Sequence, residues 1–334
     1  MPAPVRWGVL STALINRKVL AGAALSSQVD VLAVASRDGD RAKAFAAEHG
    51  IARPYSSYEA LLADPDVEAV YIPLPNSLHH PWTLEALRAG KHVLCEKPYS
   101  RRPDDVVEAF DLAEANGLVL SEAFMYRYNP QIRRAAELVG SGAIGELRLV
   151  NASFSWPTPL DGDIRTDAGL DGGSLMDVGC YCVSAARLFA GEPRTVVAQS
   201  VTGPSGVDSS LVATLSFDGG VLAHLDSAFH VPDRSHLEVV GTTGTIRVSD
   251  PWHCLAPGLV RTGLDGVPHD EPVEVANSYR LELEQLGRAV RARTGDDPSP
   301  AEPLLLLGRD DALGQARAIE ALYSSAARGV AVRL

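Results

Sequence analysis

The stretch that decides the fold is RWGVLSTALIN at residues 6–16, where an apolar strand pattern runs directly into the start of a helix pattern. Four more short apolar runs follow before residue 123, and a helical pattern separates each run from the next. Alternation of this kind is typical of βαβ units, which build a parallel sheet covered by helices. We therefore expect strands at Arg6–Leu10, Val29–Ser36, Ala69–Pro73, His92–Cys95 and Leu118–Glu122. The intervening helices are expected at Ile15–Ala24, Asp40–His49, Ser57–Ala63, His80–Ala89 and Pro103–Asn116.

The pattern changes after Tyr128. Helices are expected at Pro130–Gly140 and Ser174–Ala190, and strands without intervening helices follow, with a hairpin turn at residues 218–220. Such consecutive strands predict an antiparallel sheet. We therefore predict an α/β Rossmann domain at residues 1–122, with a doubly wound parallel sheet. An α+β domain with a largely antiparallel open sheet is predicted at residues 123–334, its C-terminal helix within 301–328 packing back on the first domain.

Composition limits the function classes. The chain has 334 residues and a formal net charge of −12, which disfavours binding to nucleic acid or to an anionic membrane. No apolar run reaches the length of a membrane span, and the first residues lack a signal-peptide pattern. The four cysteines have neither disulfide nor metal-ligand spacing, so we expect no metal site. A reduced, cytoplasmic setting is expected.

The loop after the first strand departs from the dinucleotide fingerprint. Glycines would be expected at positions 11, 13 and 16, where this chain has Ser11, Ala13 and Asn16. Small residues still allow backbone N–H groups and a helix N-terminus to approach a pyrophosphate, and Ser11 or Thr12 could donate a hydroxyl. The alternative is an ordinary turn that binds no ligand.

The end of the second strand indicates which cofactor would bind. Arg37 can face a 2′-phosphate and stack on adenine, Ser36 can hydrogen-bond the same phosphate, and Arg41 adds positive charge. This predicts NADP. A solvated arginine is the alternative, and Asp38 could reach a ribose hydroxyl, so NAD is disfavoured rather than excluded.

Several motifs are far more specific than the loop. They read PNSLH at 75–79, ALRAGKHVLCEKP at 86–98, EAFMYRYNP at 122–130, GGSLMDVGCY at 172–181 and VGTTG at 240–244. Together they resemble the glucose–fructose oxidoreductase and inositol dehydrogenase family (Gfo/Idh/MocA) over nearly the whole chain. The chain is most similar to its dihydrodiol dehydrogenase, NADP-xylose dehydrogenase and sugar 3-ketoreductase branches.

The resemblance implies which residues carry the chemistry. It implies that Lys97, Asp177 and Tyr181 form the catalytic group and that the peptide bond before Pro98 is cis. His79 would border the nicotinamide, although a helix-capping or packing role is the alternative. The cofactor-binding residues that we predict are Ser11, Thr12, Ala13, Ile15, Ser36, Arg37, Arg41, Pro73, Leu74, Asn76, His79, Glu96 and Lys97.

Helical spacing supports part of this set. Asp177 and Tyr181 lie four apart and hence on one helix face, on a polar stripe that Ser174 and Ser184 extend. The stripe could be a solvent face, but it lacks Lys and Glu, and a glycine-rich loop that suits close approach of a ligand precedes it. Substrate contacts are predicted from Tyr126, Arg127, Trp156, Arg165 and Tyr279.

These residues predict hydride transfer between nicotinamide and a sugar, keto-sugar or cyclic diol carbon. In reduction, Tyr181 would donate a proton to the alkoxide while Lys97 stabilises that oxygen, or Lys97 would be the acid and Tyr181 would position it. Asp177 would orient a substrate hydroxyl or Lys97. The competing hypothesis is a non-catalytic dinucleotide-binding sensor or scaffold. By analogy with the family, the open sheet would pair two subunits into a homodimer or higher homo-oligomer.

Overall fold

The computed structural model describes residues 3–158, 162–294 and 306–334, and the chain forms two compact units. The first unit joins Met1–Met125 with Ser278–Leu313, and the second joins Tyr126–Asn277 with Gly314–Leu334. The predicted loop at residues 296–303 and the predicted helix start at Ala301 lie outside the described residues. The division at residues 122 and 123 stays a prediction.

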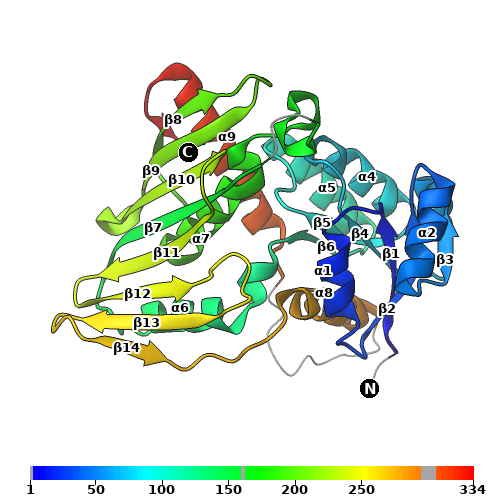
Figure 1. Cartoon of the computed structure of the whole chain (residues 1–334), viewed down its shortest axis with the longest axis horizontal. Coiled ribbons are helices and arrows are strands. Elements are labelled where there is room, and N and C mark those ends of the chain that lie inside the picture. Colours follow the sequence, from blue (N-terminus) through cyan, green and yellow to red (C-terminus); the bar gives the residue numbers. More distant parts are fainter. Residues whose placement is uncertain (1–2, 159–161, 295–305) are drawn as a thin grey trace. The chain divides into compact units, whose positions relative to one another are not determined.

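The first unit is a parallel six-stranded sheet in the order β3-β2-β1-β4-β5-β6 (Figure 1). This is the strand order of the Rossmann fold, in which the direction of winding reverses between β1 and β4. The strands are β1 (Val5–Leu10), β2 (Val29–Ala35), β3 (Arg53–Tyr55), β4 (Ala69–Ile72), β5 (His92–Glu96) and β6 (Leu120–Ala123). The helices are α1 (Asn16–Ala23), α2 (Gly39–His49), α3 (Tyr58–Leu62), α4 (Asn76–Arg88), α5 (Pro103–Ala115) and α8 (Ser278–Thr294).

Helices cover both faces of this sheet, as its continuous apolar strands require. On one face α1 and α8 share a core with side chains of β1, β4 and β5, among them Trp7 and Tyr71, and Leu286 of α8 belongs to this core. On the other face Gly8 makes room for α3, because a Cβ there would lie 2.5 Å from Cδ2 of Leu61. Arg291 of α8 also donates to the carbonyls of Ala3 and Pro4 and pairs with Glu68 at 2.6 Å, so this late helix is fixed to the start of the chain.

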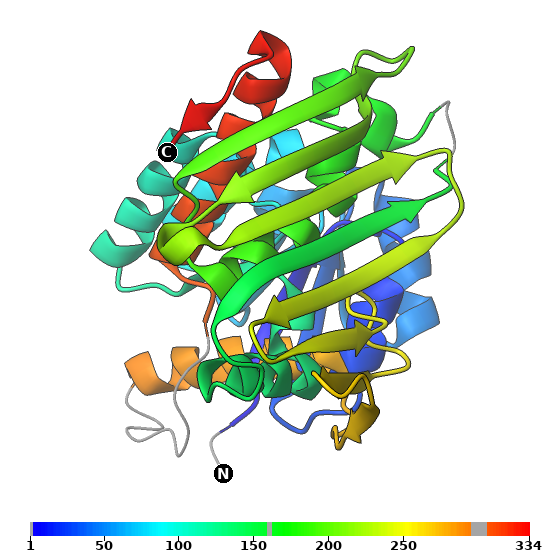
Figure 2. The same cartoon turned by 90° about the vertical axis from the view of Figure 1, so that its left-hand side faces the viewer.

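The second unit is a nine-stranded sheet in the order β14-β13-β12-β11-β7-β10-β9-β8-β15, shown broadside in Figure 2. Every neighbouring pair is antiparallel except β10 and β7, which run parallel. The strands are β7 (Leu147–Trp156), β8 (Thr195–Thr202), β9 (Asp208–Ser216), β10 (Leu222–Phe229), β11 (Arg234–Gly241), β12 (Gly244–Ser249), β13 (Gly258–Gly263), β14 (Pro268–Glu271) and β15 (Val332–Arg333). The predicted Rossmann and largely antiparallel sheets are both confirmed.

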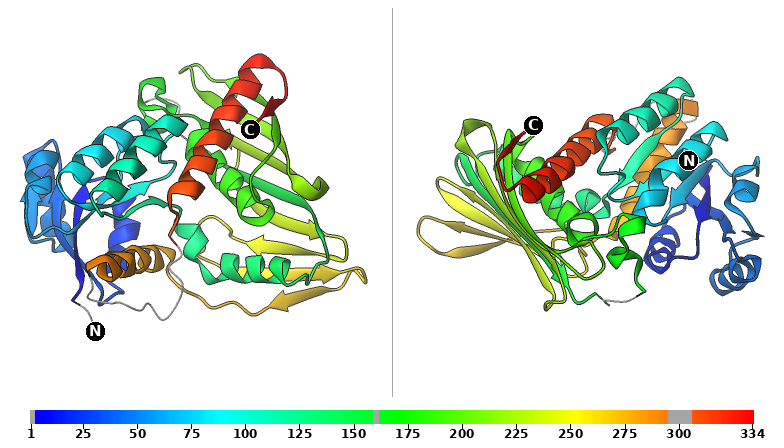
Figure 3. Two further views of the ribbon diagram at one scale, coloured as in Figure 1. Left: turned by 180° about the vertical axis from the view of Figure 1, so that it is seen from behind. Right: turned by 90° about the horizontal axis from the view of Figure 1, so that it is seen from above.

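Helices of the second unit lie on one face of its sheet and leave the other face open (Figures 2 and 3). They are α6 (Pro130–Gly140), α7 (Cys180–Ala190) and the part of α9 (Arg309–Arg328) from Gly314 onward, with short 3-10 turns at Met125–Tyr128, Ile164–Thr166, Ala168–Leu170 and Asp218–Gly220. A π-helical turn at Leu175–Gly179 leads directly into α7. No helix among the described residues is long and apolar enough to cross a membrane.

The structure corrects several predicted elements. Helix α4 begins at Asn76 rather than His80, with Pro81 inside it, and the helix predicted from Ser174 opens with the π turn. The strands β3, β13, β14 and β15 were not predicted. They lie toward the edges of their sheets and carry few apolar residues, so the alternation that marks a half-buried strand is weak there.

Candidate active site

The cofactor end of the first unit lies where β1 and β4 finish, because ligands of such sheets bind beyond the carboxyl ends at the reversal point. Ser11 follows β1, while Pro73 and Leu74 follow β4. The Ser11 hydroxyl donates to the Pro73 carbonyl at 3.1 Å, so the structure joins these two predicted loops. The side chain of Asn16 donates to the Ser11 carbonyl at 2.8 Å and closes the turn.

Ser11 adopts a glycine-like backbone. Its φ is 137°, a region that residues with a Cβ rarely adopt, at the position where the fingerprint has its first glycine. The hydroxyl accepts the N–H of Ala13 at 3.2 Å, which offsets part of the strain. Ser11 therefore has a backbone conformation that the fingerprint would give to a glycine. Ile15 precedes α1 and no side chain caps that helix; the N–H groups of Asn16, Arg17 and Lys18 donate instead to the carbonyls of Ala13, Leu14 and Ile15.

The positive charge predicted for a 2′-phosphate lies at the end of β2. Arg37 is exposed, and Arg41 of α2 donates to the Thr12 hydroxyl at 3.3 Å, which connects α2 with the phosphate loop. Oδ1 of Asp38 accepts the N–H groups of Asp40 and Arg41 at 3.0 and 3.2 Å, so this carboxylate caps α2. An aspartate used as a cap is a poor ribose ligand, which favours NADP over NAD.

Sequence reasoning missed Tyr58, the first residue of α3. Its ring is buried and packs edge-on against Trp82 at 4.8 Å between centroids. Burial raises the pKa of Tyr58, while the nearby charges of Arg37 and Arg41 and a hydrogen bond with Arg37 lower it. The Tyr58 hydroxyl therefore lies beside the two predicted phosphate-binding arginines. Only its place three residues after β3 could have pointed to it.

The ends of β4 and β5 are connected through His79. The buried ring is 2.8 Å from the Leu74 carbonyl through Nε2 and 2.9 Å from the Pro98 carbonyl through Nδ1. Burial lowers the pKa of His79 to about 4, so the ring is neutral near pH 7 and donates to one carbonyl at a time. The peptide bond between Lys97 and Pro98 is cis, as the resemblance implied. These contacts fit the packing alternative for His79, and its role at the nicotinamide stays a prediction.

Lys97 follows β5 directly and is partly buried. The preceding Glu96 accepts the hydroxyl of Tyr71 at 2.5 Å through one oxygen and the backbone N–H of Lys97 at 3.3 Å through the other. Burial, with the charge of Glu96, raises the pKa of Tyr71 well above its ordinary value, so Tyr71 remains a hydrogen-bond donor. This bond fixes Glu96 and thereby the strand end that carries Lys97. Asn76, predicted beside the cofactor, is the first residue of α4.

The second unit carries the other two predicted catalytic residues on the π turn and α7. Oδ2 of Asp177 accepts the indole N–H of Trp156 at 3.1 Å and lies 3.4 Å from Nε of Arg165. The Arg165 guanidinium lies 5.2 Å from the centre of the Trp156 ring and also pairs with Asp163 at 3.1 Å. Burial opposes the charge of Arg165, yet the carboxylates of Asp177 and Asp163 raise its pKa. The structure thus joins Asp177 with two predicted substrate residues.

Tyr181 lies among aromatic rings. The ring centroids of Phe154, Tyr126 and Trp252 are 5.5, 5.6 and 6.0 Å from that of Tyr181. Trp252 is buried and donates its N–H to the Ser153 carbonyl at 2.9 Å, which holds the cluster on the sheet. Phe154 and Trp252 were not predicted, because nothing local in the sequence marks a residue that packs on a distant helix.

The remaining predicted substrate residues have structural contacts. Tyr126 is fully buried and donates its hydroxyl to Oγ of Ser184 at 2.8 Å, and Arg127 donates to the same oxygen at 3.1 Å. Ser184 therefore belongs to the packing of α7. Tyr279 packs against the core of the first unit, as does the rest of α8. Lys97 belongs to the first unit, and Asp177 and Tyr181 belong to the second.

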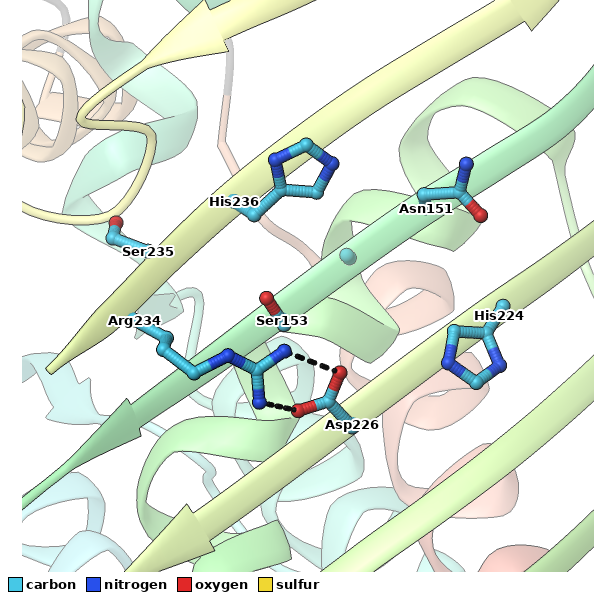
Figure 4. Close-up of a pocket in the computed structure, with 8 residues that line it drawn as sticks. Asn151, Ser153, His224, Asp226, Arg234, Ser235 and His236 are labelled. Carbon is cyan, nitrogen blue, oxygen red and sulfur yellow. Dashed lines mark hydrogen bonds and ion pairs between the residues drawn. The ribbon is translucent and has the colours of Figure 1, made fainter. Parts of the chain in front are cut away.

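A separate polar hollow of about 540 Å³ lies on the open face of the sheet (Figure 4). Side chains alternate along a strand, so Asn151 and Ser153 face away from Phe154, which contacts Tyr181. Arg234 forms a two-pronged ion pair with Asp226 across the hollow, at 2.6 and 3.2 Å. The other lining residues are Ala152, His224, Ser235 and His236.

Comparison with known proteins identifies the class. Residues 5–124 match the oxidoreductase family with an NAD-binding Rossmann fold, and residues 132–247 match the GFO/IDH/MocA C-terminal domain. The chain belongs to this family of oxidoreductases.

Individual relatives come from the branches named above. The chain is 42% identical to a D-xylose 1-dehydrogenase (NADP(+)) of Haloferax volcanii, over 98% of this chain and 99% of that protein. It is 33% identical to a trans-1,2-dihydrobenzene-1,2-diol dehydrogenase of Xenopus laevis, over 84% and 86%. A 3-ketoreductase of Actinomadura kijaniata, solved with NADP and TDP-benzene, superposes with a TM-score of 0.87 at 33% identity, over 96% of this chain and 98% of that chain. The predicted NADP-dependent oxidoreductase is confirmed over a non-catalytic sensor.

Proposed function

We propose that the chain catalyses reversible hydride transfer between NADP and an alcohol or ketone carbon of a carbohydrate-like substrate: a sugar, keto-sugar or cyclic diol. The observation that carries this proposal is the pairing of Asp177 with Trp156 and Arg165 next to the caged ring of Tyr181. This site contains the carboxylate of Asp177, the indole ring of Trp156 and the phenol of Tyr181. Asp177 and Tyr181 come from the π turn and α7, and Trp156 comes from the end of β7. Those groups suit a neutral molecule with several hydroxyls.

The residues of the first unit fit the cofactor. The positive φ of Ser11 supports close approach of a pyrophosphate to this loop, and the exposed Arg37, at the end of β2, lies beside Tyr58 of α3. The carboxylate of Asp38 is used by α2. When bound there, NADP supplies or accepts the hydride.

In the reductive direction we assign the role of proton donor to Tyr181. The phenol is held by three aromatic rings, so its hydroxyl keeps one position while it donates to the developing alkoxide. Lys97 stabilises the negative charge that forms on that oxygen. Asp177, itself fixed by Trp156, orients a neighbouring substrate hydroxyl. In oxidation the same groups act in reverse.

The decisive test combines binding with turnover. Fluorescence titration with NADPH and NADH should show clearly tighter NADPH binding, and Arg37→Ala should abolish most of that preference. A screen of aldoses, polyols, dihydrodiols and keto-sugars should then find turnover that Lys97→Ala loses, while the surface variant Arg88→Ala keeps it. Tight NADPH binding without turnover on any of these substrates would contradict the catalytic proposal.

We also propose that the open sheet face pairs with a second copy of the chain. Four exposed apolar side chains, Val197, Val201, Val212 and Leu222, share that face with the hollow, because their strand partners place them in register. Exposed apolar groups of this kind are typical of interfaces. Sedimentation should give a dimer, and Val212→Asp together with Leu222→Asp should give a folded monomer. A wild-type monomer at micromolar concentration would contradict the proposal.

A cytoplasmic location is proposed from the cysteines. All four are buried, and none of them forms a disulfide within the described residues, which suits a reducing compartment. Fractionation of cells that express the chain should place it with cytoplasmic markers, and recovery with a secreted or membrane fraction would contradict this location.

A further inference from the structure

The carboxylate of Asp208 lies beneath the start of the helix that carries Asp177 and Tyr181. Asp208 opens β9 and is 7% exposed. One oxygen accepts the hydroxyl of Ser174 at 2.7 Å and the backbone N–H of Leu175 at 2.8 Å. The other accepts the hydroxyl of Tyr323, on α9, at 2.8 Å. One side chain therefore connects β9, α9 and the first turn of the catalytic helix.

Glycines on either side of this turn allow its backbone to lie close to Asp208 and to the neighbouring strand. Gly173 has a φ of +128°, and a Cβ there would collide with the Asp208 carboxylate and lie 3.0 Å from the Tyr323 hydroxyl. Six residues later, a Cβ at Gly179 would lie 2.8 Å from Oγ of Ser227 on β10. Ser227 also lies 3.0 Å from Ser174, oxygen to oxygen. Two glycines thus let the turn settle directly on the two strands beneath it.

The turn at Leu175–Gly179 is π-helical, and its first N–H group is bound by a residue from another element. A π-helical turn is rare and occurs mostly as a single turn within an α-helix, frequently at functional sites. Its start at Leu175 has no side-chain cap from its own preceding residue, and the Leu175 N–H goes to Asp208 instead. Asp177 is the third residue of this turn and Tyr181 the second of α7. A shift at Leu175 therefore displaces both side chains.

We propose that Asp208 is a positioning residue for the reaction: its carboxylate fixes the first turn of the helix on β9 and α9 and so sets the places of Asp177 and Tyr181. This inference rests on the proposed function, because it assigns a role toward those two residues. Asp208 acts as a hydrogen-bond acceptor, since its partners are two hydroxyls and one N–H. A neutral acceptor of the same shape should replace it.

The test compares Asp208→Ala with Asp208→Asn. The alanine variant loses all three hydrogen bonds, so Asp177 and Tyr181 should be slightly misplaced. Because a small misplacement of reacting groups slows the reaction strongly, we expect kcat to fall about 10- to 100-fold. The affinity for NADPH should stay within about twofold of wild type. The asparagine oxygen can accept from Ser174 and Leu175 while Tyr323 turns its hydroxyl, so we expect kcat within about threefold of wild type. Equal losses in both variants would overturn the proposal.

A matched control distinguishes misplacement of the catalytic side chains from a general loss of stability. Ser325 is fully buried in α9 and accepts the N–H of Ala198 at 2.9 Å, in the same unit but away from the catalytic helix. Ser325→Ala should lower the melting temperature and leave kcat unchanged. If Asp208→Ala does not fold, Tyr323→Phe removes one of the three bonds and should lower kcat about threefold. A fall of kcat in Ser325→Ala as large as in the Asp208 variants would contradict a positioning role.

Hydrogen exchange supplies a readout that needs no substrate. Amides at 174–181 should exchange faster in Asp208→Ala and at the wild-type rate in Asp208→Asn. If the wild type turns over no substrate, the proposed function fails and the positioning role fails with it. If the wild type is active and Asp208→Ala equals it in kcat, only the present inference fails.

Discussion

The cofactor end of the first unit and the catalytic helix of the second are built in different ways. Most hydrogen bonds around Ser11 and Asp38 join residues two to five apart in the chain. Those around the catalytic helix join residues 34, 58 and 115 apart. The turn of the first region depends mainly on local segments, apart from the bond of Ser11 to Pro73, 62 positions away. The second region exists only when distant strands and helices have assembled. Changes in the two regions should therefore have different consequences.

The largest effect is expected in the second region. Tyr181→Phe keeps the ring in its aromatic cage and removes only the hydroxyl, so the fold and NADPH affinity should stay as in wild type. Loss of the proton donor should lower kcat about 10²- to 10⁴-fold. Steady-state kinetics with Tyr55→Phe as the control measures this. A near-normal rate for Tyr181→Phe would make Lys97 the proton donor.

The pH dependence of stability should follow two buried histidines of the first unit, His79 and His92. Burial lowers the pKa of His79 and of His92 to about 4, while an unfolded histidine titrates near 6.5. Between these values the unfolded chain binds protons that the folded chain does not, so the free energy of unfolding falls as pH drops from 6.5 to 4. His79→Asn should flatten this slope in urea unfolding curves. The exposed His269→Asn should leave it unchanged, and an unaltered slope in His79→Asn would contradict the assignment.

A smaller effect should show whether the phosphate loop holds strain. Ser11→Ala keeps a Cβ at φ 137° and loses the hydrogen bond to Pro73, whereas Ser11→Gly loses the bond and removes the strain. The alanine variant should be less stable than the glycine variant by about 1–2 kcal/mol. Thermal unfolding of the two variants checks this. Equal stability of the two variants would mean that the alanine variant releases the strain by leaving the positive φ at residue 11.

The smallest effect concerns Tyr58. Tyr58→Phe keeps the packing on Trp82 and removes the hydroxyl beside Arg37, so NADPH binding should weaken about threefold, with NADH binding unchanged. Fluorescence titration measures both affinities, with Tyr99→Phe as a buried tyrosine control. If NADH binding weakens as much as NADPH binding, the Tyr58 hydroxyl supports the fold of α3 and not the 2′-phosphate site.

Part of the candidate site could be predicted because its signals are local. Arg37 follows a strand, Lys97 follows another, and Asp177 and Tyr181 have helical spacing, so their elements were readable from the pattern of apolar residues. Ser174 shows the limit of that reasoning. It was placed on the polar stripe with Asp177, but it is fully buried against Asp208 and Ser227, because the π turn changes the angle between successive residues.

The sequence by itself determined the two kinds of sheet and the family, because periodicity, turn residues and motifs are properties of contiguous segments. Only the tertiary structure decided that α8 packs on the first sheet, that Trp156 and Arg165 hold Asp177, and that Asp208 supports their helix. The physical reason is that a buried hydrogen bond or ring contact depends on which side chains meet in space. No spacing along the chain encodes a meeting between residues more than 100 positions apart, such as Asp208 and Tyr323.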